Sequence, residues 1–124
     1  EADLIVAFEK MEALRALPYL KKGGAIITDV REILPMPVLT GEEEYPEDCI
    51  DDLKKTVGDV IVVKAAEKAE ELGNVKCQNI CLLGALIKKL GLDGVDWKAI
   101  IKDTVPAKVV DVNMKAYDAG REMA

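Results

Sequence analysis

The sequence predicts an α/β fold with a mostly parallel β-sheet and a set of C-terminal helices. Three observations lead to it. Short, continuous apolar runs, typical of strands buried on both faces, recur in the first half of the chain. A helical pattern separates the first two runs, and two parallel strands need such a crossover. After the third run, only helical patterns follow.

The first unit is Asp3 to Asp29 and is predicted as strand, helix, strand. Leu4 to Phe8 is an apolar run, and Met11, Leu14 and Leu17 then recur at the three-residue spacing of one helix face. We expect Lys21 to Gly24 to end this helix, with positive charge near its C-terminus and glycine for the left-handed stop. Ala25 to Thr28 is the second strand.

The middle of the chain is less regular. Val30 to Leu39 contains two prolines, which favour an extended connection or an edge strand over a central strand. Thr40 to Asp48 is a polar, acidic loop, and its proline suits the first turn of a helix that runs to about Val57. Asp59 to Lys64 is the third strand, again a continuous β-branched run.

Four helices are predicted in the rest of the chain. The second, Gln78 to Leu90, is apolar on most sides, so it is either buried all round or part of an interface. Gly84 lies in its middle, and because glycine costs about 1 kcal/mol there relative to alanine, we expect close helix packing. The other three are Ala65 to Leu72, Trp97 to Asp103 with Asp96 as its N-cap, and Lys108 to Ala124.

Composition narrows the classes of function. The 124 residues make one domain, and the net charge of −6 argues against a nucleic-acid or anionic-membrane partner. No apolar run approaches the roughly 20 residues of a membrane span. Histidine is absent, which removes Ser-His-Asp and Cys-His catalysis. Three cysteines without a signal peptide indicate a reducing cytoplasm.

The cysteines allow two interpretations. Cys77 and Cys81 are one helical turn apart, and with Cys49 they could make a three-thiolate site. The spacing lacks the CxxC pairs of zinc or iron–sulfur sites. Buried structural cysteine is the favoured alternative, because free cysteine is commonly buried. We therefore predict no metal site.

The candidate ligand-binding residues follow the ends of the first two strands. In open α/β sheets, ligands bind outside the carboxyl ends of the strands. That position singles out Glu9, Asp29 and Arg31, and helix capping or surface ion pairing is the alternative for all three. Asn79 lies within the mostly apolar helix and needs a hydrogen-bond partner. A cap or an interhelical hydrogen bond is the alternative to a ligand.

No G-x-G-x-x-G and no P-loop pattern is present. Four segments together nevertheless resemble the small, gamma-type subunit of the 2-oxoacid:ferredoxin oxidoreductases, and in particular the beta subunits of the indolepyruvate enzymes. They are ADLIVAFEKMEALRALPYLKKGGAIITD, VREILPMPVLTG, CQNICLLGALIKKL and VPAKVVDVNMKAYDAG. The resemblance covers nearly the whole chain, and the order and spacing of the segments carry it.

The resemblance implies a three-layer αβα, Rossmann-like fold similar to domain III of pyruvate-ferredoxin oxidoreductase. It also implies an accessory, non-catalytic subunit of an enzyme that oxidatively decarboxylates an arylpyruvate such as indolepyruvate to acyl-coenzyme A. Thiamine diphosphate, Mg²⁺ and iron–sulfur clusters would belong to a large partner subunit, and ferredoxin would take the electrons. This chain would bind none of these cofactors alone, but it would pack on the thiamine-binding domains and help shape the active-site and coenzyme A side. The candidate cofactor-binding residues are Glu9, Asp29, Arg31 and Asn79.

Family members begin with a glycine-rich strand–turn–helix, whereas this chain opens on Glu1-Ala2-Asp3. We expect residues 1–124 to be one gamma-type domain without that N-terminal part, and to be inactive alone. Two alternatives stay open: a stand-alone coenzyme- or nucleotide-binding α/β domain, and an interaction module whose apolar helix, Ile80 to Leu90, docks on a partner.

Overall fold

The computed structural model describes residues 1–31, 39–41 and 49–124. Three strands, β1 (Ala2–Ala7), β2 (Leu20–Asp29) and β3 (Asp59–Val63), form a sheet in the order β1-β2-β3. Both pairings are parallel, so the prediction of a parallel α/β sheet is confirmed.

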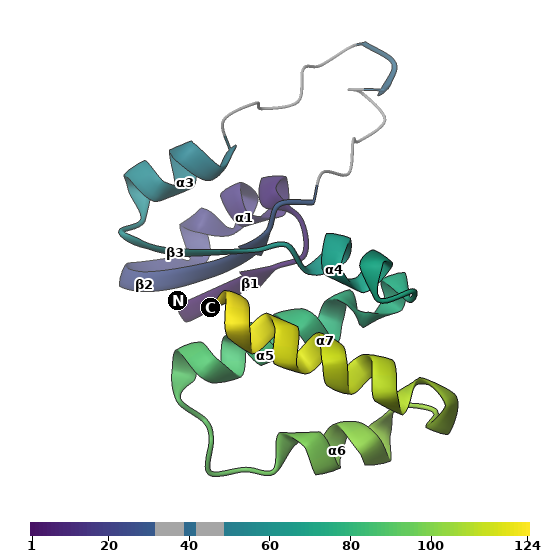
Figure 1. Cartoon of the computed structure of the whole chain (residues 1–124). Coiled ribbons are helices and arrows are strands. Elements are labelled where there is room, and N and C mark those ends of the chain that lie inside the picture. Colours follow the sequence, from purple (N-terminus) through teal and green to yellow (C-terminus); the bar gives the residue numbers. More distant parts are fainter. Residues whose placement is uncertain (32–38, 42–48) are drawn as a thin grey trace.

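Helices cover both faces of the sheet, which gives the three predicted layers (Figure 1). One face carries α1 (Lys10–Ala16) and α3 (Cys49–Thr56). The other face carries α4 (Ala65–Glu71), α5 (Gln78–Leu90) and α7 (Val110–Met123), and α6 (Trp97–Thr104) packs outside them on α7.

The alternation of side chains along the strands divides the core. Ile26 is fully buried against α1 and α3, whereas the next residue, Ile27, is fully buried against α4, α5 and α7. The core is aliphatic and alanine-rich, with Ala65, Ala69 and Ala85 all fully buried. A parallel sheet buried in this way needs apolar residues on both faces, which explains the unbroken apolar runs.

One element boundary was wrong. Lys21 to Gly24 lie in β2 and not at the end of a helix, since α1 ends at Ala16 and a 3-10 turn, Leu17–Tyr19, follows. Pro18 sits in that turn, where its missing N–H costs least, so the chain leaves the helix early. Gly23 does adopt φ +82°, but within an irregular stretch of strand pairing, where Ala2 pairs with Leu20 and Leu4 with Ala25.

Two predictions fall mainly outside the described residues. The extended connection from residue 30 to 39 and the acidic loop from residue 40 to 48 lie largely within residues 32–38 and 42–48. So does the predicted first turn of the helix that follows. Its described part is α3, which ends at Thr56, one residue before the predicted end.

Helices α5 and α7 share the most extensive contact between elements of the described part of the chain, and glycine lets their backbones approach closely. A Cβ on Gly84 would lie 2.2 Å from the backbone oxygen of Tyr117, and one on Gly120 would lie 1.8 Å from that of Cys81. No side chain fits at either distance. The close packing predicted from Gly84 is confirmed.

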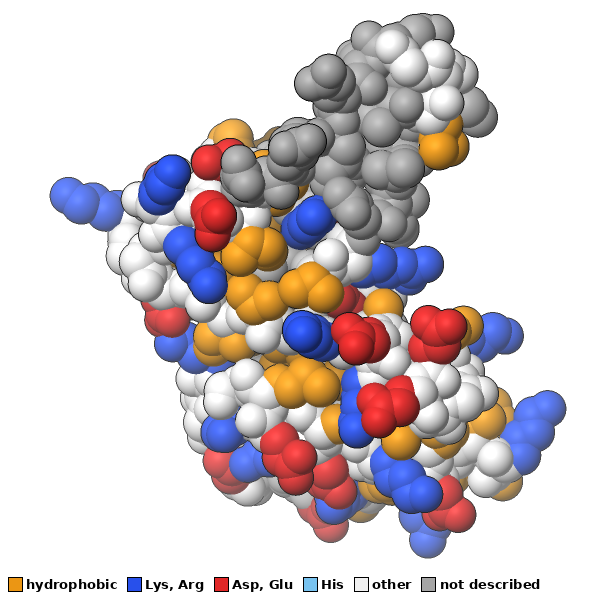
Figure 2. All heavy atoms as spheres, turned by 45° about the horizontal axis from the view of Figure 1, so that its top comes forward, with side chains coloured by type: hydrophobic (Ala, Val, Ile, Leu, Met, Phe, Trp, Pro, Cys, Tyr) orange, Lys and Arg blue, Asp and Glu red, His pale blue; other side chains and the backbone are white. Residues whose placement is uncertain are grey.

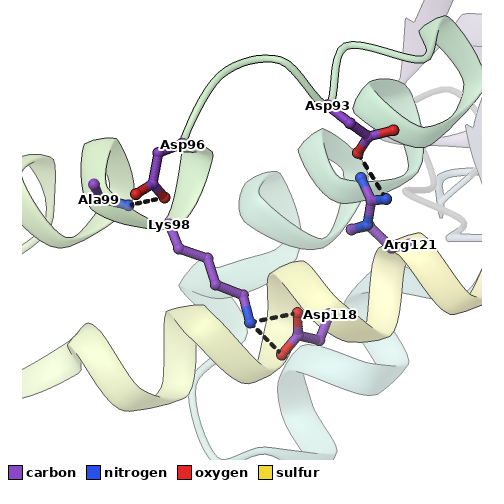
Figure 3. A network of polar contacts seen from close by, with 6 residues as sticks. All are labelled: Asp93, Asp96, Lys98, Ala99, Asp118 and Arg121. Atoms are coloured by element: carbon purple, nitrogen blue, oxygen red, sulfur yellow. Dashed lines mark hydrogen bonds and ion pairs between the residues drawn. The ribbon is translucent and has the colours of Figure 1, made fainter.

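Polar contacts attach α6 and the preceding loop to α7 (Figure 3). Asp96 caps α6 by accepting a hydrogen bond from the Ala99 amide at 3.2 Å, as predicted. Lys98 pairs with Asp118 at 3.0 Å, and Arg121 pairs with Asp93 at 2.8 Å. In the described part of the chain, none of the helices combines the length and apolar character needed to cross a membrane.

Candidate functional site at the carboxyl edge of the sheet

The carboxyl ends of β1 and β2 lie side by side because the two strands are parallel. Phe8 and Glu9 follow β1, and Arg31 follows β2. The Lys10 amide donates to the Arg31 carbonyl oxygen at 3.1 Å. This hydrogen bond joins the segments that follow β1 and β2. The structure therefore brings Glu9, Asp29 and Arg31 to one edge, as the strand endings predicted.

Asp29 is fully buried, and both of its carboxylate oxygens are engaged. Oδ1 accepts from the Arg31 amide at 3.1 Å, while Oδ2 accepts from the Ala66 amide and from Gln78 Nε2, each at 2.8 Å. A buried carboxylate needs such donors to offset its lost hydration. Asp29 thereby joins the end of β2 to the starts of α4 and α5.

Gln78 is the residue of this edge that sequence reasoning missed. It is buried at the first position of α5. Its Nε2 donates to the Phe8 carbonyl oxygen and to Asp29 Oδ2, each at 2.8 Å, and its Oε1 accepts from Arg31 Nη1 at 3.2 Å. The sequence held one signal, namely a polar residue directly before an apolar helix, but we assigned it to the neighbouring Asn79.

The other candidates lie as follows. Glu9 is buried, and its Oε1 accepts from the Met11 amide at 2.7 Å, so it caps α1. Asn79 is exposed, and its Oδ1 accepts from the Ile80 amide at 2.8 Å. Glu9 therefore makes the capping contact that was the alternative to ligand binding. The Asn79 hydrogen bond instead stays within α5, whose N-cap is Cys77. Arg31 differs, because its guanidinium is exposed and only its inner side is held.

All three cysteines are buried, and none of them is joined in a disulfide. Burial raises the pKa of all three thiols, and that of Cys81 reaches about 11. Within residues 1–31, 39–41 and 49–124, no three acidic, cysteine or histidine residues are gathered to hold a metal ion.

Charge is mixed on the face seen in Figure 2, where basic and acidic side chains alternate around a band of apolar ones. No patch of a single sign covers this face.

These features define a parallel α/β domain with polar groups at the carboxyl ends of its strands. The sequence profile of the family described as pyruvate ferredoxin/flavodoxin oxidoreductase matches residues 1–123. The chain belongs to this family.

Named relatives refine the similarity. The chain is 41% identical to indolepyruvate oxidoreductase subunit IorB of Pyrococcus horikoshii, and 40% identical to that of Thermococcus kodakarensis. Each alignment covers 100% of this chain and 64% of the relative. The 2-oxoglutarate synthase subunit KorC of Methanothermobacter thermautotrophicus is 31% identical over 98% of this chain and 59% of its own length. The chain thus spans less than two thirds of the length of these relatives.

Proposed function

We propose that the chain is part of an accessory subunit of a 2-oxoacid:ferredoxin oxidoreductase, one that decarboxylates an arylpyruvate such as indolepyruvate oxidatively to acyl-coenzyme A. The observation that carries the proposal is the 41% identity, over the whole chain, to a protein named as an indolepyruvate oxidoreductase subunit. The match of the family profile to residues 1–123 supports the same class of enzyme.

The catalytic chemistry is assigned to a large partner subunit. In the holoenzyme, thiamine diphosphate with Mg²⁺ would supply the decarboxylation chemistry, and iron–sulfur clusters would carry electrons to ferredoxin. This chain contains no histidine, and its buried carboxylates at the sheet edge already accept backbone hydrogen bonds. Its three buried thiols favour the protonated form, which also fits a cytoplasmic subunit without its own cluster.

Within that enzyme, the carboxyl edge is the side of this domain that faces a ligand. Arg31 and Asn79 are the exposed members of the candidate set, so they are the ones that can touch a ligand directly. Asp29 and Glu9 are buried and fix the backbone at this edge, because each accepts a hydrogen bond from a backbone amide of an adjoining helix.

A substrate panel tests the proposal. The full-length chain is co-expressed with its candidate large subunit, and viologen reduction is measured with indolepyruvate, pyruvate and 2-oxoglutarate, with and without coenzyme A. We expect coenzyme A-dependent turnover, fastest with indolepyruvate. Preference for 2-oxoglutarate would reassign the substrate, and no turnover with any 2-oxoacid would remove the proposal.

A further inference from the structure

We propose that Arg31 and Gln78 form a preorganised binding unit for a small-molecule oxyanion, either a carboxylate or a phosphate group. Arg31 contacts the anion, and Gln78 acts as a positioning residue. The identity of the ligand rests on the proposed function, whereas the binding chemistry rests on the geometry alone.

The orientation of the Gln78 amide follows from its partners. Its nitrogen faces two acceptors, the Phe8 carbonyl and the Asp29 carboxylate, both at 2.8 Å. A reversed amide would point its oxygen at two other oxygens, so only one orientation is compatible with these contacts. The amide oxygen must then face Arg31, whose Nη1 donates to it at 3.2 Å.

The Arg31 backbone is fixed as well. Its amide donates to Asp29 Oδ1 at 3.1 Å, and its carbonyl accepts from the Lys10 amide at 3.1 Å. Backbone and guanidinium are therefore both held before any ligand arrives. Less conformational entropy is then lost on binding, which is the advantage of a preorganised site.

Arg31 does not serve simply to neutralise the buried carboxylate. Asp29 takes its three hydrogen bonds from two backbone amides and from Gln78, and the guanidinium bonds to Gln78 instead. A guanidinium carries five N–H donors in a planar fork that matches carboxylate and phosphate oxygens. Arg31 is an exposed residue, and its hydrogen bond to Gln78 uses only Nη1, so other donors of the fork can serve such a group.

The surroundings also favour an anion with an apolar portion. The site lies at the N-terminus of α5, a 13-residue helix whose dipole favours negative charge there. Phe8, whose carbonyl binds Gln78, is 48% exposed and offers an aromatic surface at the same edge. The nearby Glu9 carboxylate opposes an anion, but it is buried and bonded to the α1 backbone.

The first experiment compares Arg31→Gln with Arg15→Gln in the assembled enzyme. Arg15 is a matched control, because it is also exposed and its ion pair with Glu12 lies on α1. We expect Arg31→Gln to raise the KM for one anionic substrate about tenfold. A rise for the 2-oxoacid identifies a carboxylate site, and a rise for coenzyme A identifies a phosphate site. Arg31→Lys should restore part of the loss, since it keeps the charge without the fork.

The second experiment tests positioning by Gln78. We expect Gln78→Ala to raise the same KM by a smaller factor, and to add nothing in the Arg31→Gln background. A purely structural role would instead lower the amount of folded complex equally in both backgrounds.

A direct titration separates this inference from the proposed function. The Nε–H resonance of Arg31 in the full-length chain is followed with inorganic phosphate and with acetate at low ionic strength. A saturable shift that is weakened in Gln78→Ala supports the site even if the enzyme assay shows no turnover. No saturable shift with either anion, or unchanged KM values in active Arg31→Gln enzyme, would overturn it.

Discussion

Asp29 is the residue that holds the carboxyl edge together. One buried carboxylate joins the end of β2 to the first turn of α4, to the start of α5 and to the backbone of Arg31. Because the charge is removed from water, each of these hydrogen bonds is a strong one. The geometry of the edge thus depends on the buried Asp29 carboxylate, which accepts all of these hydrogen bonds.

Asp29→Asn should lower the free energy of unfolding by roughly 2–4 kcal/mol, because its single NH2 group must face either the Arg31 amide or the Ala66 and Gln78 donors. Urea unfolding of both chains measures the change. Asp103→Asn, at an exposed position on α6, is the control and should stay within about 0.5 kcal/mol. Equal stability of Asp29→Asn and the parent chain would show that the charge is dispensable.

Cys81 should resist thiol reagents in the folded protein. Burial raises its pKa from 9.0 to about 11, so the thiolate is scarce at pH 8, and the side chain is fully buried. Since the folded pKa lies above the unfolded one, its contribution to stability is present below pH 9 and is lost as the pH rises toward 11. Mass spectrometry after labelling at pH 8, with and without urea, measures how far folding protects Cys81 from a thiol reagent. Labelling of Cys81 at the same rate in both conditions would contradict it.

At the residue scale, position along the strands predicted which side chains lie at the carboxyl edge, but not the hydrogen bonds that join them. Glu9, Asp29 and Arg31 could be singled out because each follows a strand end, which is local information. Gln78 could not, since its contacts to Phe8 and Asp29 span 70 and 49 residues and appear only when the sheet and α5 meet.

At the scale of elements, the packing of α5 on α7 is the most demanding contact. Gly84 and Gly120 each lie against the backbone of the opposite helix, so neither helix can approach this closely with any larger residue. Glycine lowers the helix propensity of both helices, but it allows their backbones to come into close contact. This contact fixes where α5 begins relative to the sheet, and hence where Gln78 reaches the edge.

Gly120→Ala should destabilise the chain by roughly 1–3 kcal/mol, although alanine is the better helix former, because the helices must move apart. Gly58→Ala is the matched control. A Cβ there meets nothing within 4 Å and φ is not positive, so this variant should be neutral or slightly stabilised. Thermal unfolding of the two variants gives the comparison, and a stabilised Gly120→Ala chain would show that the close approach is not needed.

Regular periodicity was sufficient to predict most elements. The three strands and α5 follow from unbroken apolar runs and from one apolar helix, and α6 follows from its Asp96 cap. The segment from Lys21 to Gly24 was misassigned because lysine and glycine also suit a helix end. Pairing of β2 with β1, a contact between distant segments, overrode that local preference.

At the scale of the whole molecule, the sheet, its two helical layers and the family are consistent with one another. The resemblance predicted a Rossmann-like domain of the oxidoreductase family, and both the parallel sheet and the family profile confirm it. Composition and spacing alone reached only an α/β domain, since no catalytic motif lies in the chain. The family could be predicted because similarity extends over all segments at once, not because any one residue is diagnostic.

The central claim is that this chain works as an accessory subunit, and dependence of activity on assembly tests it most directly. The full-length chain and its candidate large subunit are purified separately and together, and thiamine- and coenzyme A-dependent viologen reduction by indolepyruvate is measured for each. We predict that the two proteins co-elute and that the mixture turns over while the chain alone does not. Separate elution with no turnover in the mixture, or full activity of the large subunit without this chain, would contradict the claim.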